Sequence, residues 1–219
     1  MESGLTAFFD ELQARTAAER AELLAIPAIA ESLAGRVTRA RYVAFLRQAY
    51  HHVRHTVPLL IAARARLGED RPQLSAALAR YIAEEEGHEA WILDDLRACG
   101  DDAEAAQRAA PAAATELLVA YVYDYIARVH PAGMLGMVFV LEGTSTALAT
   151  RAAEAIRSAL GLPASAFRYL TSHGSIDQEH LRFFAQTVNP LPAAEREHVV
   201  HAARCVYRLY GDIFRGLPA

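Results

Sequence analysis

Helical periodicity runs through almost all of the 219-residue sequence, and it constrains the fold more than any other feature. Apolar residues recur at intervals of three and four, and alanine, leucine, arginine and glutamate fill the periodic segments, as is typical of amphipathic helices. The alternation of apolar and polar residues that would indicate strands is nearly absent. The sequence therefore predicts an all-α protein.

Glycine and proline residues divide this periodicity into helices joined by short loops. No internal repeat and no low-complexity linker separates one part of the chain from another. We therefore expect a single domain over residues 1–219, a helical bundle of about seven to nine helices. The helices are expected over about 5–24, 28–33, 38–67, 73–98, 111–130, 134–160 and 165–188, with a polar loop at 101–102 and a last helix that ends near 214.

Charge and composition exclude several classes of function. The net charge of −4 and the pI of about 6.1 imply no strong attraction to nucleic acids. All 22 basic residues are arginine, so an internal lysine Schiff base and a Walker phosphate loop are both excluded. The two cysteines, Cys99 and Cys205, are too distant in sequence to form a Cys-x-x-Cys metal or redox motif.

We expect no membrane association from the sequence. Residues 1–4 lack the basic and apolar pattern of a signal peptide. The strongest apolar run, Met134–Leu141, is too short to span a bilayer and stops at Glu142. The expectation is a cytoplasmic protein with reduced cysteines, and a homodimer is common for bundles of this kind.

Residues 84–89, Glu-Glu-Glu-Gly-His-Glu, form an acidic cluster around one histidine within the predicted helix 73–98. Glu85 and His88 are three residues apart, so both side chains can face one ion from the same side of a helix. Glu-x-x-His pairs occur in the di-iron sites of helical bundles. A solvated acidic helix face would give the same short pattern.

Glu142 follows the apolar segment Met134–Leu141, and the helix around it is expected to be buried. A buried carboxylate without a partner is costly, so it is normally neutral, paired or bound to a metal. The nearest following arginine, Arg151, is more than two helical turns away. A hydrogen-bonded core glutamate, or a pair with an arginine of another helix, is the alternative.

The most specific motif is His173-Gly-Ser-Ile-Asp177-Gln-Glu-His180. Its offsets of four and seven residues place two imidazoles and a carboxylate on one helical face. This mixture of nitrogen and oxygen ligands suits Fe(II), Mn(II) or Zn(II) better than calcium or magnesium, which prefer oxygen alone. The alternatives are an exposed polar stripe, or a His173 that only caps a bend at Gly174.

A further group of histidines, His51, His52 and His55, lies in the predicted helix 38–67. These side chains can ligate a metal, support a ligand through hydrogen bonds, contact a substrate or lie at the surface. His198 and His201 on the last helix are expected at the surface. Tyr121, Tyr123 and Tyr125 are expected mostly in the core, with one at a pocket.

Together these segments offer enough carboxylates and imidazoles for two metal ions. A zinc hydrolase needs only three protein ligands, whereas carboxylates that can bridge favour a dinuclear iron site. No Gly-x-Ser-x-Gly motif for nucleophilic catalysis is present. The predicted ligands are Glu85, His88, Glu142, His173, Asp177 and His180, with His52 and Glu84 as additional ligands or supporting groups.

At these residues the chain resembles the haem-oxygenase-like di-iron oxidases, which bind no haem and are related to haem oxygenase and to thiaminase-like and quinone-cofactor-biosynthesis proteins. The resemblance covers most of the chain in length and helix order. It is carried by His173, Asp177 and His180, by Glu142 at the matching interval before them, and by His88. It implies a haem-oxygenase-like bundle with two Fe(II) ions per chain and no haem.

The chain departs from many members of that family at one position. They place a carboxylate ligand two turns before the histidine that matches His88, and here this position is Tyr81. Other members use a Glu-x-x-His pair, which Glu85 and His88 would supply, with a carboxylate from the preceding core helix. On that helix this chain carries histidines, among them His52.

The resemblance implies an O2-dependent oxidase or oxygenase of a small amine, amino-acid or fatty-acid substrate. The expected reaction is oxidative C–C cleavage, desaturation or N-oxygenation in a biosynthetic pathway. The expected pocket walls are residues 121–125 and 134–139. The alternatives are a metal-independent thiaminase-like or cofactor-biosynthesis enzyme on the same bundle, and a binding protein with structural histidines.

Overall fold

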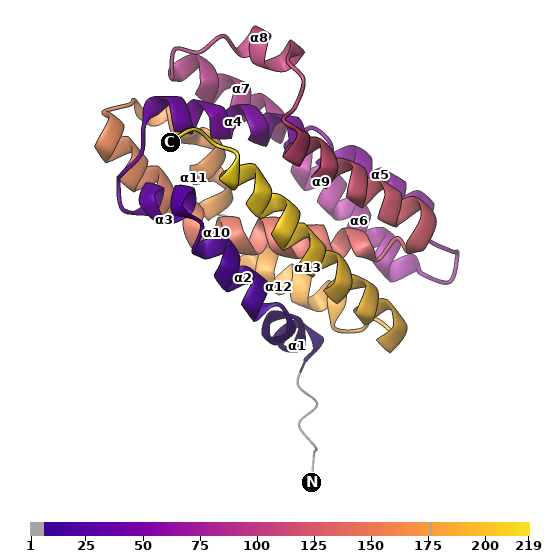
Figure 1. Ribbon diagram of the computed structural model, residues 1–219. Coiled ribbons are helices and arrows are strands. Elements are labelled where there is room, and N and C mark those ends of the chain that lie inside the picture. The colour runs from indigo at the N-terminus through magenta and orange to yellow at the C-terminus, as the bar shows by residue number, and fades with distance from the viewer. Residues whose placement is uncertain (1–6, 176) are drawn as a thin grey trace.

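The computed structural model describes residues 7–175 and 177–219, without the side chains of residues 173–179. Over these residues the regular structure consists of thirteen α-helices, one π-helix and one 3-10 helix, which confirms the predicted all-α class (Figure 1). In chain order they are α1 (Phe8–Arg15), α2 (Ala17–Leu24), α3 (Pro27–Leu33), α4 (Arg39–Val53), α5 (Thr56–Ala65), α6 (Pro72–Glu85), α7 (His88–Ala98), α8 (Ala103–Arg108), α9 (Ala113–Asp124), η1 (Tyr125–Val129), α10 (Gly133–Leu160), η2 (Ala164–Phe167), α11 (Arg168–Ser175), α12 (Asp177–Val188) and α13 (Ala193–Arg215).

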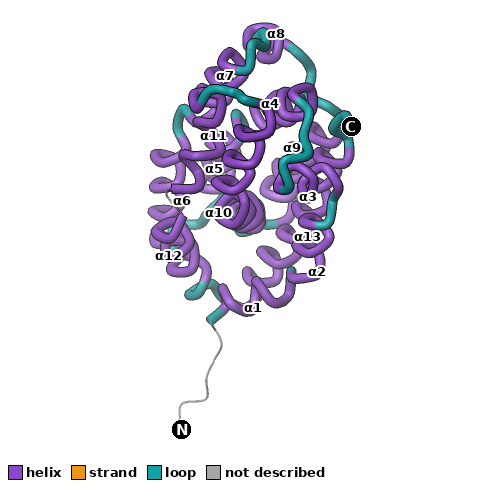
Figure 2. Tube along the Cα trace, turned by 90° about the vertical axis from the view of Figure 1, so that its left-hand side faces the viewer, coloured by secondary structure: helices purple, strands orange, loops and turns teal. Residues whose placement is uncertain are grey.

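Helix α10 is the centre of the bundle. Figure 2 shows it nearly end-on, with other helices on every side. It packs against α13, α11, α12 and α3, and its first part, residues 133–140, is buried on all faces. By length and composition α10 could also cross a membrane, but half of its most apolar stretch is buried inside this fold. Its apolar character is therefore explained by its place in the core.

The crossing of α10 and α13 is close enough to require a glycine. A Cβ atom on Gly136 would lie 2.6 Å from the Ala203 backbone nitrogen and 2.8 Å from the Val199 carbonyl oxygen. Both of these are backbone atoms, which cannot move aside as a flexible side chain could. The core around the candidate site therefore depends on this one small residue.

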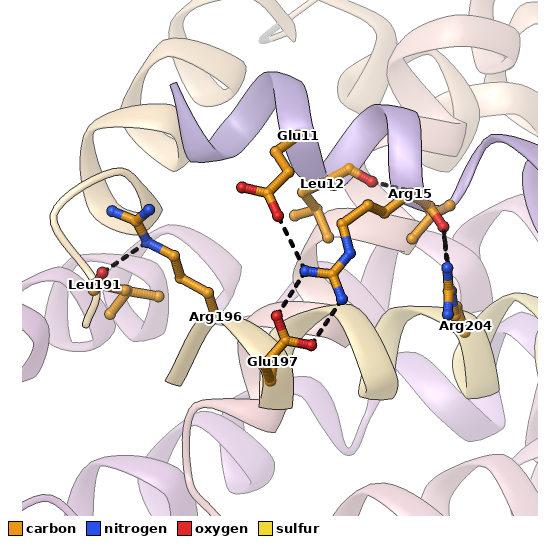
Figure 3. Close-up of polar contacts among 8 residues, drawn as sticks. Glu11, Leu12, Arg15, Leu191, Arg196, Glu197 and Arg204 are labelled. Atoms are coloured by element: carbon orange, nitrogen blue, oxygen red, sulfur yellow. Dashed lines mark hydrogen bonds and ion pairs between the residues drawn. The ribbon is translucent and has the colours of Figure 1, made fainter. Parts of the chain in front are cut away.

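The N-terminal helix α1 is held to the outside of α13 by polar contacts (Figure 3). The Arg15 guanidinium donates to both carboxylate oxygens of Glu197 at 2.6 Å, and it also donates to Glu11 at 3.0 Å. Arg204 of α13 donates to the Arg15 carbonyl oxygen at 2.7 Å. These groups are largely exposed, so we expect each contact to contribute no more than about 1 kcal/mol.

The structure divides several helices that the periodicity predicted as continuous. The predicted helix 5–24 is interrupted at Thr16, whose hydroxyl donates to the Leu12 carbonyl oxygen at 2.8 Å. The predicted helix 38–67 is α4 and α5, and the end of the predicted helix 111–130 is the π-helix η1. Helix α8, which was not predicted, follows the predicted polar loop at 101–102, and Asp102 caps it by accepting from the Ala105 N–H at 2.8 Å.

One of these interruptions falls between two predicted metal ligands, Glu85 and His88. The predicted helix 73–98 breaks between α6 and α7, because Gly87 adopts the left-handed conformation with φ of 86°. The predicted helix 165–188 is a 3-10 turn followed by α11 and α12, which end and begin on either side of residue 176. Residue 176 and the side chains of residues 173–179 lie outside the described residues, so the predicted common face of His173, Asp177 and His180 stays a prediction.

Candidate metal centre

A cavity of about 50 Å³ lies beside α10 where α4, α5 and α6 meet it. Its lining includes one predicted ligand from each of three helices, namely His52 of α4, Glu85 of α6 and Glu142 of α10. Tyr81 contributes to the same wall. This volume is enough for a few water molecules or ions, since one water needs about 10–15 Å³.

The turn at Gly87 brings Glu85 and His88 together. His88 Nδ1 and Glu85 Oε2 lie 3.0 Å apart, and the two side chains are only 7% and 11% exposed. A carboxylate on Nδ1 fixes the imidazole so that its Nε2 atom is the one available to a metal. The geometry therefore supports the predicted pairing, but it is produced by a turn and not by one helix face.

Glu84 connects this region to α12. Its Oε2 atom lies 3.6 Å from His180 Nε2, and its Oε1 atom accepts a hydrogen bond from Arg80 at 2.6 Å. Glu84 Oε2 is buried and accepts no hydrogen bond from the residues that the structure describes. A buried carboxylate oxygen of this kind fits a metal-bound state.

Tyr81 lies among the carboxylates of the site. Its side chain is 1% exposed, and its hydroxyl group has no hydrogen-bond partner within the described part of the chain. Burial raises the pKa of Tyr81 well above its usual value, and the nearby carboxylates of Glu142 and Glu84 raise it further. The phenol is therefore neutral at physiological pH and retains its proton beside the cavity.

Of the three clustered histidines, His52 is the one that lines the cavity. Its side chain is 2% exposed and stands edge-on to the Tyr210 ring at a centroid distance of 5.7 Å. The His51 ring instead stands edge-on to Tyr50, and His55 Nδ1 lies 3.3 Å from the Tyr123 hydroxyl oxygen. The structure thus places the histidine that the sequence suggested as an additional ligand at the cavity wall.

Two predicted ligands cannot be placed in this geometry, because the side chains of His173 and Asp177 lie outside the described residues. Among the side chains that are described, no three potential ligands converge closely enough to hold an ion. They form pairs instead, Glu85 with His88 and Glu84 with His180. The donor set of imidazoles and carboxylates nevertheless fits iron chemically, since both are ligands of non-haem iron.

The expected pocket walls are correct for one segment and wrong for the other. Met134, Met137 and Val138 line the cavity, whereas the lining contains none of the tyrosines between 121 and 125. The ring of Tyr125 packs instead against His198 and His201, near the surface of α13.

Sequence reasoning missed two residues at the site. Tyr169, at the start of α11, lines the cavity, and no short motif marks it. Ser145 lines it as well, and its position three residues after Glu142 on the same helix could have indicated it. Trp91, three residues after His88, stacks on the His88 ring at a centroid distance of 4.1 Å.

A family sequence profile described as iron-containing redox enzyme matches residues 43–211. This range includes every predicted ligand and most of the chain. The chain belongs to this family of iron-containing redox enzymes. No curated protein sequence matches the chain significantly.

Solved structures confirm the haem-oxygenase-like bundle. A protein of unknown function with this fold from Shewanella denitrificans is 23% identical, with a TM-score of 0.86 over 97% of this chain and 92% of its own. A TenA homologue from Pseudomonas syringae is 11% identical, with a TM-score of 0.77 over 98% and 94%. Haem oxygenase-1 from Synechocystis, in complex with haem, is 16% identical, with a TM-score of 0.74 over 96% and 91%. At these identities the similarity establishes the fold alone.

Proposed function

We propose that this member of the iron-containing redox enzymes is a non-haem, di-iron, O2-dependent oxidase or oxygenase. The observation that carries the proposal is the cavity into which α4, α6 and α10 each contribute one potential ligand, His52, Glu85 and Glu142. Bound as a pair, Fe(II) ions would supply the activation of O2. The substrate would be a small amine, amino-acid or fatty-acid molecule, oxidised in a biosynthetic pathway.

The ligand chemistry favours iron ions over haem iron. Haem takes one or two axial ligands, usually His, Cys, Met or Tyr, and leaves no role for several carboxylates. Here two carboxylates, Glu85 and Glu142, line one small cavity, and a third, Glu84, has a buried oxygen nearby. Carboxylates can bridge two iron ions. The single iron of a haem is held by its porphyrin ring and needs no bridging ligand.

The holding residues would be His52, Glu85, His88, Glu142 and His180, joined by His173 and Asp177 from the sequence motif. The carboxylate of Glu85 orients the His88 ring through Nδ1. Tyr81 retains a proton on its phenol oxygen beside the carboxylates, because burial raises the pKa of this group. Met134, Met137 and Leu141 form an apolar wall that excludes water from the cavity.

Tryptophan fluorescence gives a direct test, since Trp91 is the one tryptophan of the chain and its ring stacks on His88. We expect anaerobic Fe(II) titration to quench this fluorescence and to saturate near two ions per chain. Admission of O2 should then produce a transient visible absorption band. The matched control is His198→Ala, since this histidine belongs to the Tyr125 cluster away from the cavity and its loss should change neither signal.

Asp177→Ala tests the ligand assignment in the same assay. We expect the variant to lose at least one equivalent of iron and the visible band. Full iron loading of this variant would refute the assignment of Asp177. A wild-type protein that takes up no iron would refute the di-iron proposal and favour a metal-independent enzyme on the same bundle.

A further inference from the structure

A second cavity, of about 90 Å³, adjoins the candidate metal cavity. Ser145 and Tyr169 line both of them, so these two residues form the boundary between the cavities. Most of the surface of the second cavity is apolar, with side chains from α3, α4, α10 and α13. The two cavities are therefore adjacent and share the Ser145 and Tyr169 side chains, so a substrate that spans both would place one end at the metal cavity and its remainder among apolar side chains.

One face of α10 connects the two cavities. Glu142, Ser145, Ala149, Ala152 and Ile156 follow one another at intervals of three or four residues, which places them along a single helical stripe. The first lines the metal cavity, Ser145 lines both, and the last three line the apolar cavity. From Ser145 to Ile156 this stripe is about 16 Å long, at 1.5 Å per residue.

The apolar cavity presents no unpaired charge to a ligand. Among the described residues of its lining Arg41 is the one that carries a charge, and its guanidinium donates to the Glu31 carboxylate and to the Pro218 carbonyl oxygen, each at 2.7 Å. The aromatic wall is also fixed, because the Phe45 ring stacks on Phe214 at a centroid distance of 5.7 Å. Such a lining favours a hydrocarbon body over a zwitterionic or multiply charged one.

We propose that the substrate carries an elongated hydrocarbon body, which lies along α10 in the apolar cavity and presents its polar end to the metal cavity. Ala149 and Ala152 would set the length and width of that body, because their methyl groups leave the floor of the cavity open. This inference rests on the proposed function and names the substrate class of the same site. Among the expected substrates, it selects those with a long apolar part.

The test uses the metal-free full-length protein and a series of unbranched 1-alkanols from butanol to decanol, measured by calorimetry. We expect affinity to rise about threefold to fourfold with each methylene group, until the chain reaches the end of the cavity. Ala152→Leu should stop this rise at a shorter alkanol, and Ala152→Val should have a smaller effect in the same direction. Ala147→Leu, an exposed position on the same helix, should follow the wild type.

Two results would overturn the inference. One is an absence of alkanol binding in wild-type protein that unfolds cooperatively, and the other is an equal dependence on chain length in Ala152→Leu and wild type. Iron binding is measured separately by Trp91 fluorescence. A protein that binds iron but no alkanol keeps the proposed function and loses this inference. One that binds alkanols but no iron loses the proposed function.

Discussion

At the scale of single residues, two buried tyrosines differ in whether their hydroxyl group makes a hydrogen bond. Tyr42 donates to the Ala166 carbonyl oxygen at 2.7 Å, whereas the Tyr81 hydroxyl has no hydrogen-bond partner among the described residues. Both side chains are 1% exposed. Loss of a made hydrogen bond destabilises a protein, whereas removal of a buried, unbonded polar group costs little.

We therefore expect Tyr42→Phe to lower the free energy of unfolding by about 1 kcal/mol. In Tyr81→Phe we expect this free energy to be unchanged or slightly higher. Chemical denaturation of the two metal-free variants measures the difference. If Tyr81→Phe lowered the free energy of unfolding as much as Tyr42→Phe does, the Tyr81 hydroxyl would have a hydrogen-bond partner in the native state.

The sequence predicts some contacts of the site but not the orientation of every histidine. The pair Glu85 and His88 was predicted from a spacing of three residues on one helix, whereas their 3.0 Å contact is made across the turn at Gly87. The choice of His52 over its neighbours depends on how α4 is rotated about its axis against the core. That rotation is set by packing with helices distant in sequence, and no local pattern contains it.

At the scale of elements, the turn between α6 and α7 determines the geometry of the Glu85–His88 pair. Gly87 has φ of 86°, a conformation that costs other residues about 1–2 kcal/mol, and no atom lies within 4 Å of a Cβ built there. Gly161, at the end of α10, has φ of 63° and is equally open. The two glycines thus differ mainly in their distance from the site.

We expect Gly87→Ala and Gly161→Ala to destabilise the protein by a similar amount, about 1 kcal/mol each. Only Gly87→Ala should also weaken Fe(II) binding, because the strain acts between two candidate ligands. Thermal unfolding and the Trp91 fluorescence titration measure the two effects. Equal iron affinity in both variants would contradict a role for this turn in the metal centre.

A buried carboxylate links α7 to the start of α11. Asp95 is fully buried and accepts hydrogen bonds from the backbone N–H groups of Arg168 at 2.8 Å and Tyr169 at 2.9 Å. Burial raises the pKa of Asp95 to about 6, although these two hydrogen bonds oppose the shift. The contact positions Tyr169, which lines both cavities.

The raised pKa of Asp95 predicts a pH dependence with a definite sign. The folded state binds the Asp95 proton more tightly than the unfolded state does. The contribution of protonated Asp95 to the free energy of unfolding is therefore complete below pH 4 and is lost as the pH rises through about 6. We expect the stability advantage of wild type over Asp95→Asn to shrink between pH 4 and pH 6. Urea denaturation across this range measures it, and an advantage that grows with pH would contradict the prediction.

The helices were predicted in order and type, but the breaks between them were not. The predicted helix 134–160 agrees with α10 because Pro131 before it, Gly161 at its end and its apolar residues are all local signals. The break at Thr16 was missed, since the residues there are compatible with a helix until neighbouring elements pack on them. Such tertiary effects routinely override local propensity.

At the scale of the whole molecule, the contact between α10 and α13 holds the last helix to the central one. Because backbone atoms of α13 surround Gly136, we expect Gly136→Ala to lower the free energy of unfolding by about 1–3 kcal/mol. Gly143→Ala, on the same helix with open space around it, should raise it by up to about 1 kcal/mol. Denaturation curves of the two variants measure these changes. An unchanged free energy of unfolding in Gly136→Ala would contradict the close crossing of α10 and α13.

The bundle alone does not determine what the protein does. The TenA homologue and the haem oxygenase share this architecture at 11% and 16% identity. Function therefore depends on the side chains that face the interior. In this chain the candidate cavity is lined by one imidazole, His52, and by the carboxylates of Glu85 and Glu142, of which Glu142 also carries the family resemblance.

Anomalous diffraction at the iron edge, from crystals loaded anaerobically with Fe(II), tests the metal centre most directly. The proposal predicts two peaks, about 3.5–4 Å apart, in the cavity bounded by His52, Glu85 and Glu142. The side chains of His88 and His180 should lie within bonding distance of at least one peak. An empty cavity, or iron found only at the surface histidines of α13, would contradict the proposal.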